Sequence, residues 1–407
     1  MAGATDPLLA PRGGVGAQAD RTTRAVRATY VSFILNGFAM SSWAARIPQV
    51  RDELRLTPST LGLVLLAIAA GSIVSLSVAG PLVARFGSQR VVATMSGVLG
   101  VGLLGVAVGY RAGVAPLVVA LAVFGFANGA WDVAMNVQGA LAERALGRSI
   151  MSRFHAGWSV GTVAGALISA GLVAWHVPVS VHLAVVAGLV AAVVPFGVRG
   201  FLPDDHGVPA ATDALPERSV WAAWREPRTL LIGVFVLAFA FAEGTGNDWI
   251  AIAAIDGYGV SPAIGTLGFA LFLAAMTAGR WVGPDLLDRH GRVLMVRVTA
   301  GLAVAGLLLF VFAGHPALAF VGCVLWGLGT SLGFPVGMSA GADEPRYAAG
   351  RVSVIASIGY LAFLGGPPLI GFLGDQEGVL KGLTVVAVLM ALAILVSGAL
   401  RPPTSPR

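Results

Sequence analysis

The sequence predicts an all-α membrane protein with twelve transmembrane helices in two pseudo-symmetric six-helix bundles. Of its 407 residues, 57% are hydrophobic and 11% are charged, whereas a soluble domain carries roughly 25% charged residues. The apolar residues fall in long blocks, many of them close to the roughly 20 residues with which a helix spans a bilayer. About twelve such helices with short loops would use most of the chain, which excludes a separate soluble domain.

The blocks predict helices, in order, at about 28–49, 59–83, 89–110, 114–140, 150–174, 178–199, 228–252, 262–286, 293–314, 317–340, 350–373 and 378–399. The first block is too long for a signal-peptide core, so we expect a retained helix. The longest polar stretch between helices separates two sets of six. The expected segments are a disordered N-terminus (1–24), an N-terminal bundle (25–200), a linker (201–227), a C-terminal bundle (228–400) and a tail (401–407).

The basic residues indicate the orientation. A net charge of +6 would suggest nucleic acid as a partner of a soluble protein, but here the basic residues stand singly between apolar blocks. Twenty of the 26 lysines and arginines lie on the side of the N-terminus, five lie on the other side, and Arg280 lies within a helix. The excess predicts that both termini and the linker are cytoplasmic. The single cysteine, Cys323, excludes an internal disulfide and a cysteine metal site.

The two halves repeat each other at an offset of 204 residues. The five matching pairs are Asp52 and Asp256, Thr57 and Ser261, Pro58 and Pro262, Arg85 and Arg289, and Gly87 and Gly291. An internally duplicated helical unit is typical of transporters, whose binding site lies between the repeats.

Two loop motifs carry a resemblance to the major facilitator superfamily over nearly the whole chain. The loop after the second helix reads Gly80-Pro-Leu82-Val-Ala84-Arg85-Phe-Gly87-Ser-Gln-Arg90, and its copy contains Asp288-Arg289-His-Gly291-Arg292. They resemble the superfamily signature Gly-x-Leu-Ala-Asp-Arg-x-Gly-Arg-(Lys/Arg). The sequence departs from it at Ala84, where the family has an acid. The resemblance implies a gating role for Arg85, Asp288, Arg289 and Arg292.

Further stretches narrow the resemblance. They are Trp43-Ala-Ala-Arg46-Ile-Pro48, Asp132-Val-Ala-Met-Asn136, Met151-Ser-Arg153-Phe-His155-Ala-Gly157, and Gly359-Tyr360 with Gly366-Pro367-Pro368. Together they resemble an uncharacterised bacterial branch of the superfamily that is distantly similar to the proton-coupled fucose permeases. This implies a monomer in the bacterial plasma (inner) membrane whose partners are the lipid bilayer and a small-molecule substrate.

Helix 114–140 carries the first candidate site. Asn128, Asp132 and Asn136 are spaced four apart and therefore share one helical face. Three polar groups on one stripe of an apolar helix predict a wet cavity, and an intramembrane carboxylate there is a candidate proton or substrate site. Fucose permeases place an acid at the matching position. The alternative is a structural ion pair of Asp132 with Arg153 or Arg280.

Helix 228–252 carries the second candidate site. Glu243 lies near mid-span and Asn247 lies one turn further on, with glycines that allow the helix to bend. We expect proton coupling or substrate contact at Glu243 and substrate contact at Asn247. Asp248 is either a solvated charge or pairs with Arg46 as an external gate.

Five other side chains are candidates for contact with the substrate, and the structural alternative for His155 is that of a packed, hydrogen-bonded core residue. Asn36 lines the cavity or bonds between helices. His155 and Ser159 share a face of helix 150–174, and Tyr360 lines the cavity or packs in the core. Arg280 binds an anionic group or forms an internal salt bridge. Gly157, Gly161 and Gly165 recur every four residues and predict close helix packing.

The leading hypothesis is a proton-coupled secondary transporter that works by alternating access on a small polar solute, for which the resemblance suggests a sugar. The sequence has no phosphate-binding loop and no catalytic or metal-ligand cluster, so we expect neither an enzyme nor a cofactor, and the proton gradient as energy source. Two alternatives stay open. They are proton-driven efflux of amphipathic compounds or drugs and a non-transporting receptor on a transporter fold.

Overall fold

The computed structural model describes residues 13–147, 150–204, 220–344 and 347–402. Within these ranges every regular element is helical. The helices of the first half are α1 (Gly13–Ala44), α2 (Ile47–Leu54), α3 (Pro58–Phe86), α4 (Ser88–Ala112), α5 (Val114–Leu146), α6 (Met151–Ala174), α7 (Val179–Gly197) and η1 (Val198–Gly200). The helices of the second half are α8 (Val220–Ala223), α9 (Pro227–Tyr258), α10 (Pro262–His290), α11 (Arg292–Phe312), α12 (Pro316–Thr330), α13 (Gly333–Gly341), α14 (Ala348–Glu377), α15 (Val379–Gly382), α16 (Thr384–Val396) and η2 (Ser397–Leu400).

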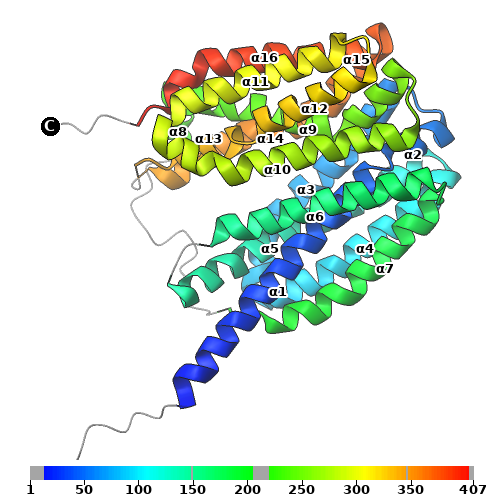
Figure 1. Ribbon diagram of the computed structural model, residues 1–407. Helices are drawn as coiled ribbons and strands as arrows, with labels where there is room; N and C mark the ends of the chain where they lie inside the picture. Colours follow the sequence, from blue (N-terminus) through cyan, green and yellow to red (C-terminus); the bar gives the residue numbers. More distant parts are fainter. Residues whose placement is uncertain (1–12, 148–149, 205–219, 345–346, 403–407) are drawn as a thin grey trace, which may run out of the picture.

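The first and second halves form two bundles that lie one above the other in Figure 1. In the first, α1 packs on α5, α6 and α7, while α4 packs on α5 and α7. In the second, α9 packs on α10, α14 and α16, while α11 packs on α12 and α16. The described ends of the chain lie on one side, the left of Figure 1, which we call the terminal face. We call the side of α2 and α15 the opposite face.

Eleven of the described helices are long and apolar enough to cross a membrane, and α1 is the remaining helix of the predicted twelve. Its polar side chains, such as Ser32 and Asn36, are buried by neighbouring helices. Large apolar side chains remain exposed around the bundles, including Val108 (71%) and Leu395 (78%). Apolar surface of this kind is suited to lipid rather than water. The prediction of an all-α membrane fold is confirmed.

The repeat predicted at an offset of 204 residues sets the helix ends. Helices α3 and α10 have 29 residues each. Thr57 and Ser261 cap their first turns by accepting a hydrogen bond from a backbone N–H, and a proline follows each cap. Both helices end before a glycine with positive φ, 81° at Gly87 and 80° at Gly291, a conformation that costs glycine little. The same local chemistry therefore ends the same helix in both halves.

The structure corrects three predicted boundaries. Residues 13–24, predicted as disordered, belong to α1, because Ala25 and Ala28 are buried and hold this end of the helix against η1. The first helix ends at Ala44 rather than 49, and α2 follows after a two-residue turn. The predicted helix 317–340 is broken between α12 and α13. Most of the predicted linker 201–227, and residues 1–12 and 403–407, lie outside the described residues.

The glycine stripe of α6 packs on α1, as its spacing predicts. A Cβ added to Gly161 or Gly165 would collide with backbone of α1, and one added to Gly37 of α1 would collide with backbone of α6. The two helices therefore approach at backbone distance, which small residues allow.

The halves meet mainly along two helix pairs, α3 with α14 and α6 with α10. The first pair touches toward the opposite face, where a Cβ on Gly62 or Gly371 would collide with the partner helix.

Candidate functional site

An ion pair joins the two halves at the opposite face. Arg51 of α2 binds Asp256 at the end of α9, with Nη2 3.0 Å from Oδ1 and Nη1 2.5 Å from Oδ2. Its Nε also donates to Asp52, at 2.8 Å. Burial alone lowers the pKa of Arg51, but the hydrogen bonds and charges of the two carboxylates together raise it above the ordinary value. One arginine thus bridges the two aspartates that the repeat relates.

Replacing Asp256 by asparagine is expected to weaken closure of the opposite face. Asp256 is 41% exposed, so this bidentate pair contributes about 1 kcal/mol, which corresponds to a roughly fivefold change in the ratio of closed to open molecules. Electron–electron distance measurement between spin labels at Glu53→Cys and Glu377→Cys, one exposed position in each half, reports this ratio. Asp52→Asn is the matched control, because it removes only a contact within one half. Equal distance distributions in Asp256→Asn and wild type would contradict the role of the ion pair.

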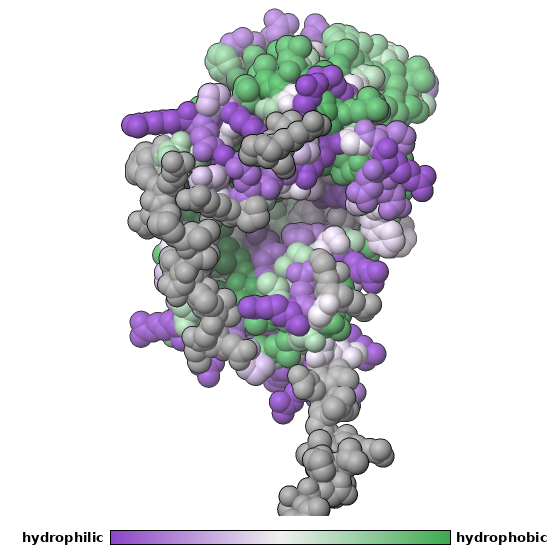
Figure 2. All heavy atoms as spheres, turned by 90° about the vertical axis from the view of Figure 1, so that its left-hand side faces the viewer, coloured by the Kyte–Doolittle hydropathy of each residue, from purple (hydrophilic) through white to green (hydrophobic). Residues whose placement is uncertain are grey.

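The terminal face is hollowed between the two bundles. Figure 2 shows this face, with hydrophilic side chains inside the hollow and along its rim. We call this hollow the central cavity. With the opposite face joined by ionic and helix contacts, the structure is open toward the terminal face.

Asp132 is a carboxylate without an ion pair among the described residues. It is partly buried on α5 and accepts a hydrogen bond from Asn136 Nδ2, at 3.2 Å. Tyr360 of α14, in the other half, is 40% exposed and lies within electrostatic range of Asp132. Asp132 therefore lies near the second bundle, and the alternative that it pairs with Arg153 or Arg280 is wrong.

Three helices of the first half share an amide network. Asn36 of α1 donates to Asn128 Oδ1 of α5 at 3.0 Å, and Trp158 Nε1 of α6 donates to Asn36 Oδ1 at 2.9 Å. Asn36 is 2% exposed, so its structural alternative, a hydrogen bond between helices, is confirmed. Asn128 is less buried and lies one turn from Asp132 on the same face. The network fixes the α5 stripe against α1 and α6.

An intramembrane ion pair occupies the second half. Arg280 Nη2 of α10 lies 2.9 Å and 2.8 Å from the two carboxylate oxygens of Glu243 on α9. The internal salt bridge considered for Arg280 is therefore confirmed, and Glu243 has a structural partner. His155 of α6 is exposed and lies within electrostatic range of Arg280 across the boundary between the halves.

Two other residues predicted to bind substrate, Asn247 and Ser159, differ in how deeply they are buried. Asn247 is partly buried, and its Oδ1 is fully buried without a hydrogen-bond partner among the described residues. Ser159 is only 2% exposed, because it lies one turn further along α6 than His155, where that helix packs on α1. The prediction that Ser159 lines the cavity is wrong for this conformation.

The proposed pairing of Arg46 with Asp248 is wrong. Arg46 is 2% exposed inside the first half, where its Nε donates to His182 Nδ1 of α7 at 2.9 Å. The chain turns after Ala44, which directs the arginine away from α9. Asp248 is partly buried and has no ion pair among the described residues, so its predicted solvation at an outer surface is also wrong.

The predicted gating residues do not form one cluster. Arg85, Asp288 and Arg289 are exposed, and no ion pair joins them within the described ranges. Arg292 binds Asp343 Oδ1 at 2.6 Å, which ties α11 to the segment after α13. In the first half, Asp204 binds Ser88 N and Oγ, each at 2.6 Å, so a carboxylate from the linker caps α4.

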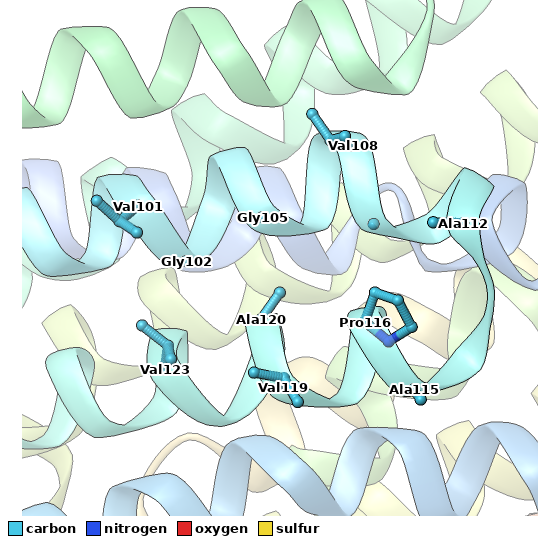
Figure 3. Close-up of a pocket in the computed structure, with 11 residues that line it drawn as sticks. Val101, Gly102, Gly105, Val108, Ala112, Ala115, Pro116, Val119, Ala120 and Val123 are labelled. Carbon is cyan, nitrogen blue, oxygen red and sulfur yellow. The ribbon is translucent and has the colours of Figure 1, made fainter.

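Two surface crevices lie away from Asp132 and Glu243. One, of about 760 Å³, lies at the terminal face between α10, α11 and α13 and includes Asp288 and Arg292. The other, of about 660 Å³, lies between α4 and α5 and is lined only by Val, Gly, Ala and Pro (Figure 3). Val101, Val108 and Val119 of its wall are 64%, 71% and 64% exposed. A crevice without polar groups on the lipid-facing surface cannot orient a polar solute.

Comparison with known proteins agrees with this architecture. The Major Facilitator Superfamily profile matches residues 29–362. An uncharacterised transporter of Sinorhizobium fredii is 30% identical over 384 residues, which cover 92% of this chain and 98% of the relative. The chloramphenicol resistance protein of Streptomyces lividans is 30% identical, over 87% of this chain and 90% of its own.

A solved structure shares the fold. The E. coli fucose:proton symporter superposes with a TM-score of 0.64 over 93% of this chain and 98% of that chain, at 15% identity. The helical architecture, the duplicated halves and these matches lead to one conclusion. The chain belongs to the Major Facilitator Superfamily and is a membrane transporter rather than an enzyme.

Proposed function

We propose that this transporter moves a small polar solute, such as a sugar, by alternating access and couples its movement to protons through Asp132. The observation that carries the proposal is the placement of Asp132, a carboxylate without an ion pair on the amide-rich face of α5, near Tyr360 of the other half. A carboxylate that is costly to keep ionised and unpaired in a membrane can exchange a proton with the cavity.

The cavity supplies matched hydrogen-bonding groups for a polyhydroxylated solute. Asn128 and Asn136 lie one turn on either side of Asp132, and Tyr360, which is 40% exposed, offers its hydroxyl from the second half. A solute that bonds to both halves favours the conformation in which they approach, because a ligand shifts a conformational equilibrium toward the state that binds it better. The similarity of fold to a fucose:proton symporter supports both the solute class and the coupling.

The excess of basic residues at the terminal face supports a cytoplasmic location for both termini in a bacterial plasma membrane. In this orientation the structure is inward-open. The proposal requires a monomer, a lipid bilayer and a proton gradient, and no cofactor.

Thermal unfolding of the detergent-purified protein against a solute panel tests the solute class. The panel contains L-fucose, other monosaccharides, nucleosides and chloramphenicol, each at pH 6 and pH 8. A solute that binds together with a proton is expected to raise the melting temperature, and to raise it more at pH 6, because bound ligand stabilises the folded state. Stabilisation by hydrophobic drugs alone would contradict the proposal.

Efflux of amphipathic compounds is the second candidate, because a chloramphenicol resistance protein is 30% identical over 87% of this chain. It predicts stabilisation by chloramphenicol that is larger at pH 8, since drug and proton compete in an antiporter. The direction of the pH effect therefore separates the two candidates.

A further inference from the structure

The turn between α1 and α2 places a cation inside the protein without a counter-charge. Arg46 precedes α2 and is 2% exposed. Among the described residues, no carboxylate pairs with it. Burial lowers the pKa of Arg46 to about 10, although nearby Tyr110 acts to raise it. The guanidinium is therefore still charged at neutral pH, and an isolated buried charge is costly unless a counter-charge accompanies it.

The hydrogen bond between Arg46 and His182 determines the tautomer of the histidine. Arg46 Nε carries a hydrogen and donates to His182 Nδ1 at 2.9 Å. Because Nδ1 accepts, the ring of His182 is neutral and its proton lies on Nε2. His182 is 3% exposed and supplies no negative charge. The pair therefore contains a net positive charge and a further N–H donor.

Both members of the pair leave buried donors unused. Arg46 Nη2 and His182 Nε2 have no hydrogen-bond partner among the residues that the structure describes. Trp43 Nε1, one turn before Arg46, is also buried without a partner, as are both side-chain polar atoms of Gln49. Six of the ten such atoms in the described part of the chain belong to Ser42, Trp43, Arg46, Gln49 and His182. Buried polar groups of native proteins almost always have partners, so this concentration indicates a missing one.

The missing partner has the chemistry of a small anion. Three of the unused groups, on Trp43, Arg46 and His182, can only donate hydrogen bonds, and one of them belongs to a cation. A donor-rich, positively charged setting selects an acceptor with negative charge. Since Arg46 and His182 are both at least 97% buried, a solute-sized or lipid-sized group has no access. We propose that the Arg46–His182 pair binds a monovalent inorganic anion of chloride size.

This anion site is distinct from the central cavity. Arg46 and His182 belong to the same half, and the bonds of Asp132 and Arg280 are to other residues. The anion would neutralise Arg46 and fix the α1–α2 turn against α7. The neighbouring Arg51 closes the opposite face, so occupancy of the site would stabilise the segment from which that ion pair extends.

Thermal unfolding in a chloride titration tests the proposal. Sodium gluconate is replaced by sodium chloride at constant sodium concentration. The wild type is expected to gain about 2 to 5 °C in melting temperature along a saturating curve, and bromide should act likewise. Arg46→Gln should lose the dependence, whereas Arg55→Gln, an exposed arginine of the same segment, should keep it.

Three results would overturn the proposal. They are the absence of a chloride effect, a rise that does not saturate, and a saturating curve that persists in Arg46→Gln. If Arg46→Gln does not fold, Arg46→Lys keeps a charge and should show the saturating curve at a higher chloride concentration. Bromide-soaked crystals provide a direct readout, because an anomalous peak is expected beside Arg46 and His182, and a peak elsewhere alone would contradict the site.

Discussion

Replacing Asp132 by asparagine is expected to abolish solute accumulation driven by a pH gradient while solute exchange continues. Asparagine keeps the size and the hydrogen bond to Asn136 but cannot bind and release a proton. With one proton per solute, a gradient of one pH unit supports up to about tenfold accumulation, since about 1.4 kcal/mol corresponds to a factor of ten. The variant should reach equal concentrations on both sides of the membrane.

Proteoliposomes loaded with labelled solute measure both activities in one preparation. Asp285→Asn is a control for loss of a negative charge, because Asp285 is exposed on α10. Asp248→Asn tests whether Asp248 carries the proton instead, since Asp248 is also partly buried without an ion pair among the described residues. Loss of accumulation in Asp248→Asn with normal accumulation in Asp132→Asn would move the coupling site to α9.

Replacing Glu243 by glutamine is expected to cost on the order of 2–4 kcal/mol of unfolding free energy, because it leaves Arg280 partly buried without its partner. The double variant Glu243→Gln with Arg280→Gln should regain part of this loss, since no unpaired charge remains. Unfolding in a denaturing detergent measures the difference. Glu53→Gln, an exposed glutamate, should change stability little.

The same variants separate a structural role of Glu243 from the coupling role that the sequence suggests. If the ion pair only holds α9 against α10, the double variant should accumulate solute at a pH gradient, although more slowly. If accumulation stays absent while exchange recovers, Glu243 takes part in coupling. A Glu243→Gln variant as stable as the wild type would contradict the ion pair itself.

Local chemistry explains why the sequence predicts the fold so closely. The caps Thr57 and Ser261, the prolines after them and the left-handed glycines Gly87 and Gly291 act within a few residues, so their positions in the sequence decide where helices begin and end. The polar face of α5 around Asp132 can be predicted equally well, because residues spaced four apart lie on the same face of a helix.

Ion pairs and hydrogen bonds between residues far apart in the chain cannot be predicted from the sequence in the same way. The sequence offers Arg46 as one possible partner of Asp248, because the repeat makes their helices counterparts, but the turn after Ala44 directs the arginine toward His182. Arg51 and Asp256 were missed as a pair, although the repeat of Asp52 and Asp256 pointed to this position. A partner more than 100 residues away depends on how helices pack, which hydropathy and spacing do not specify.

The most direct test of the central claim is the movement of protons when solute enters de-energised proteoliposomes. The solute is one that the thermal panel identifies, added outside to weakly buffered vesicles with an external pH electrode. A symporter carries protons inward with the solute, so the account predicts alkalinisation of the medium by the wild type and none by Asp132→Asn. Acidification by the wild type would show exchange of solute for protons, and equal alkalinisation by Asp132→Asn would show that another residue carries the proton.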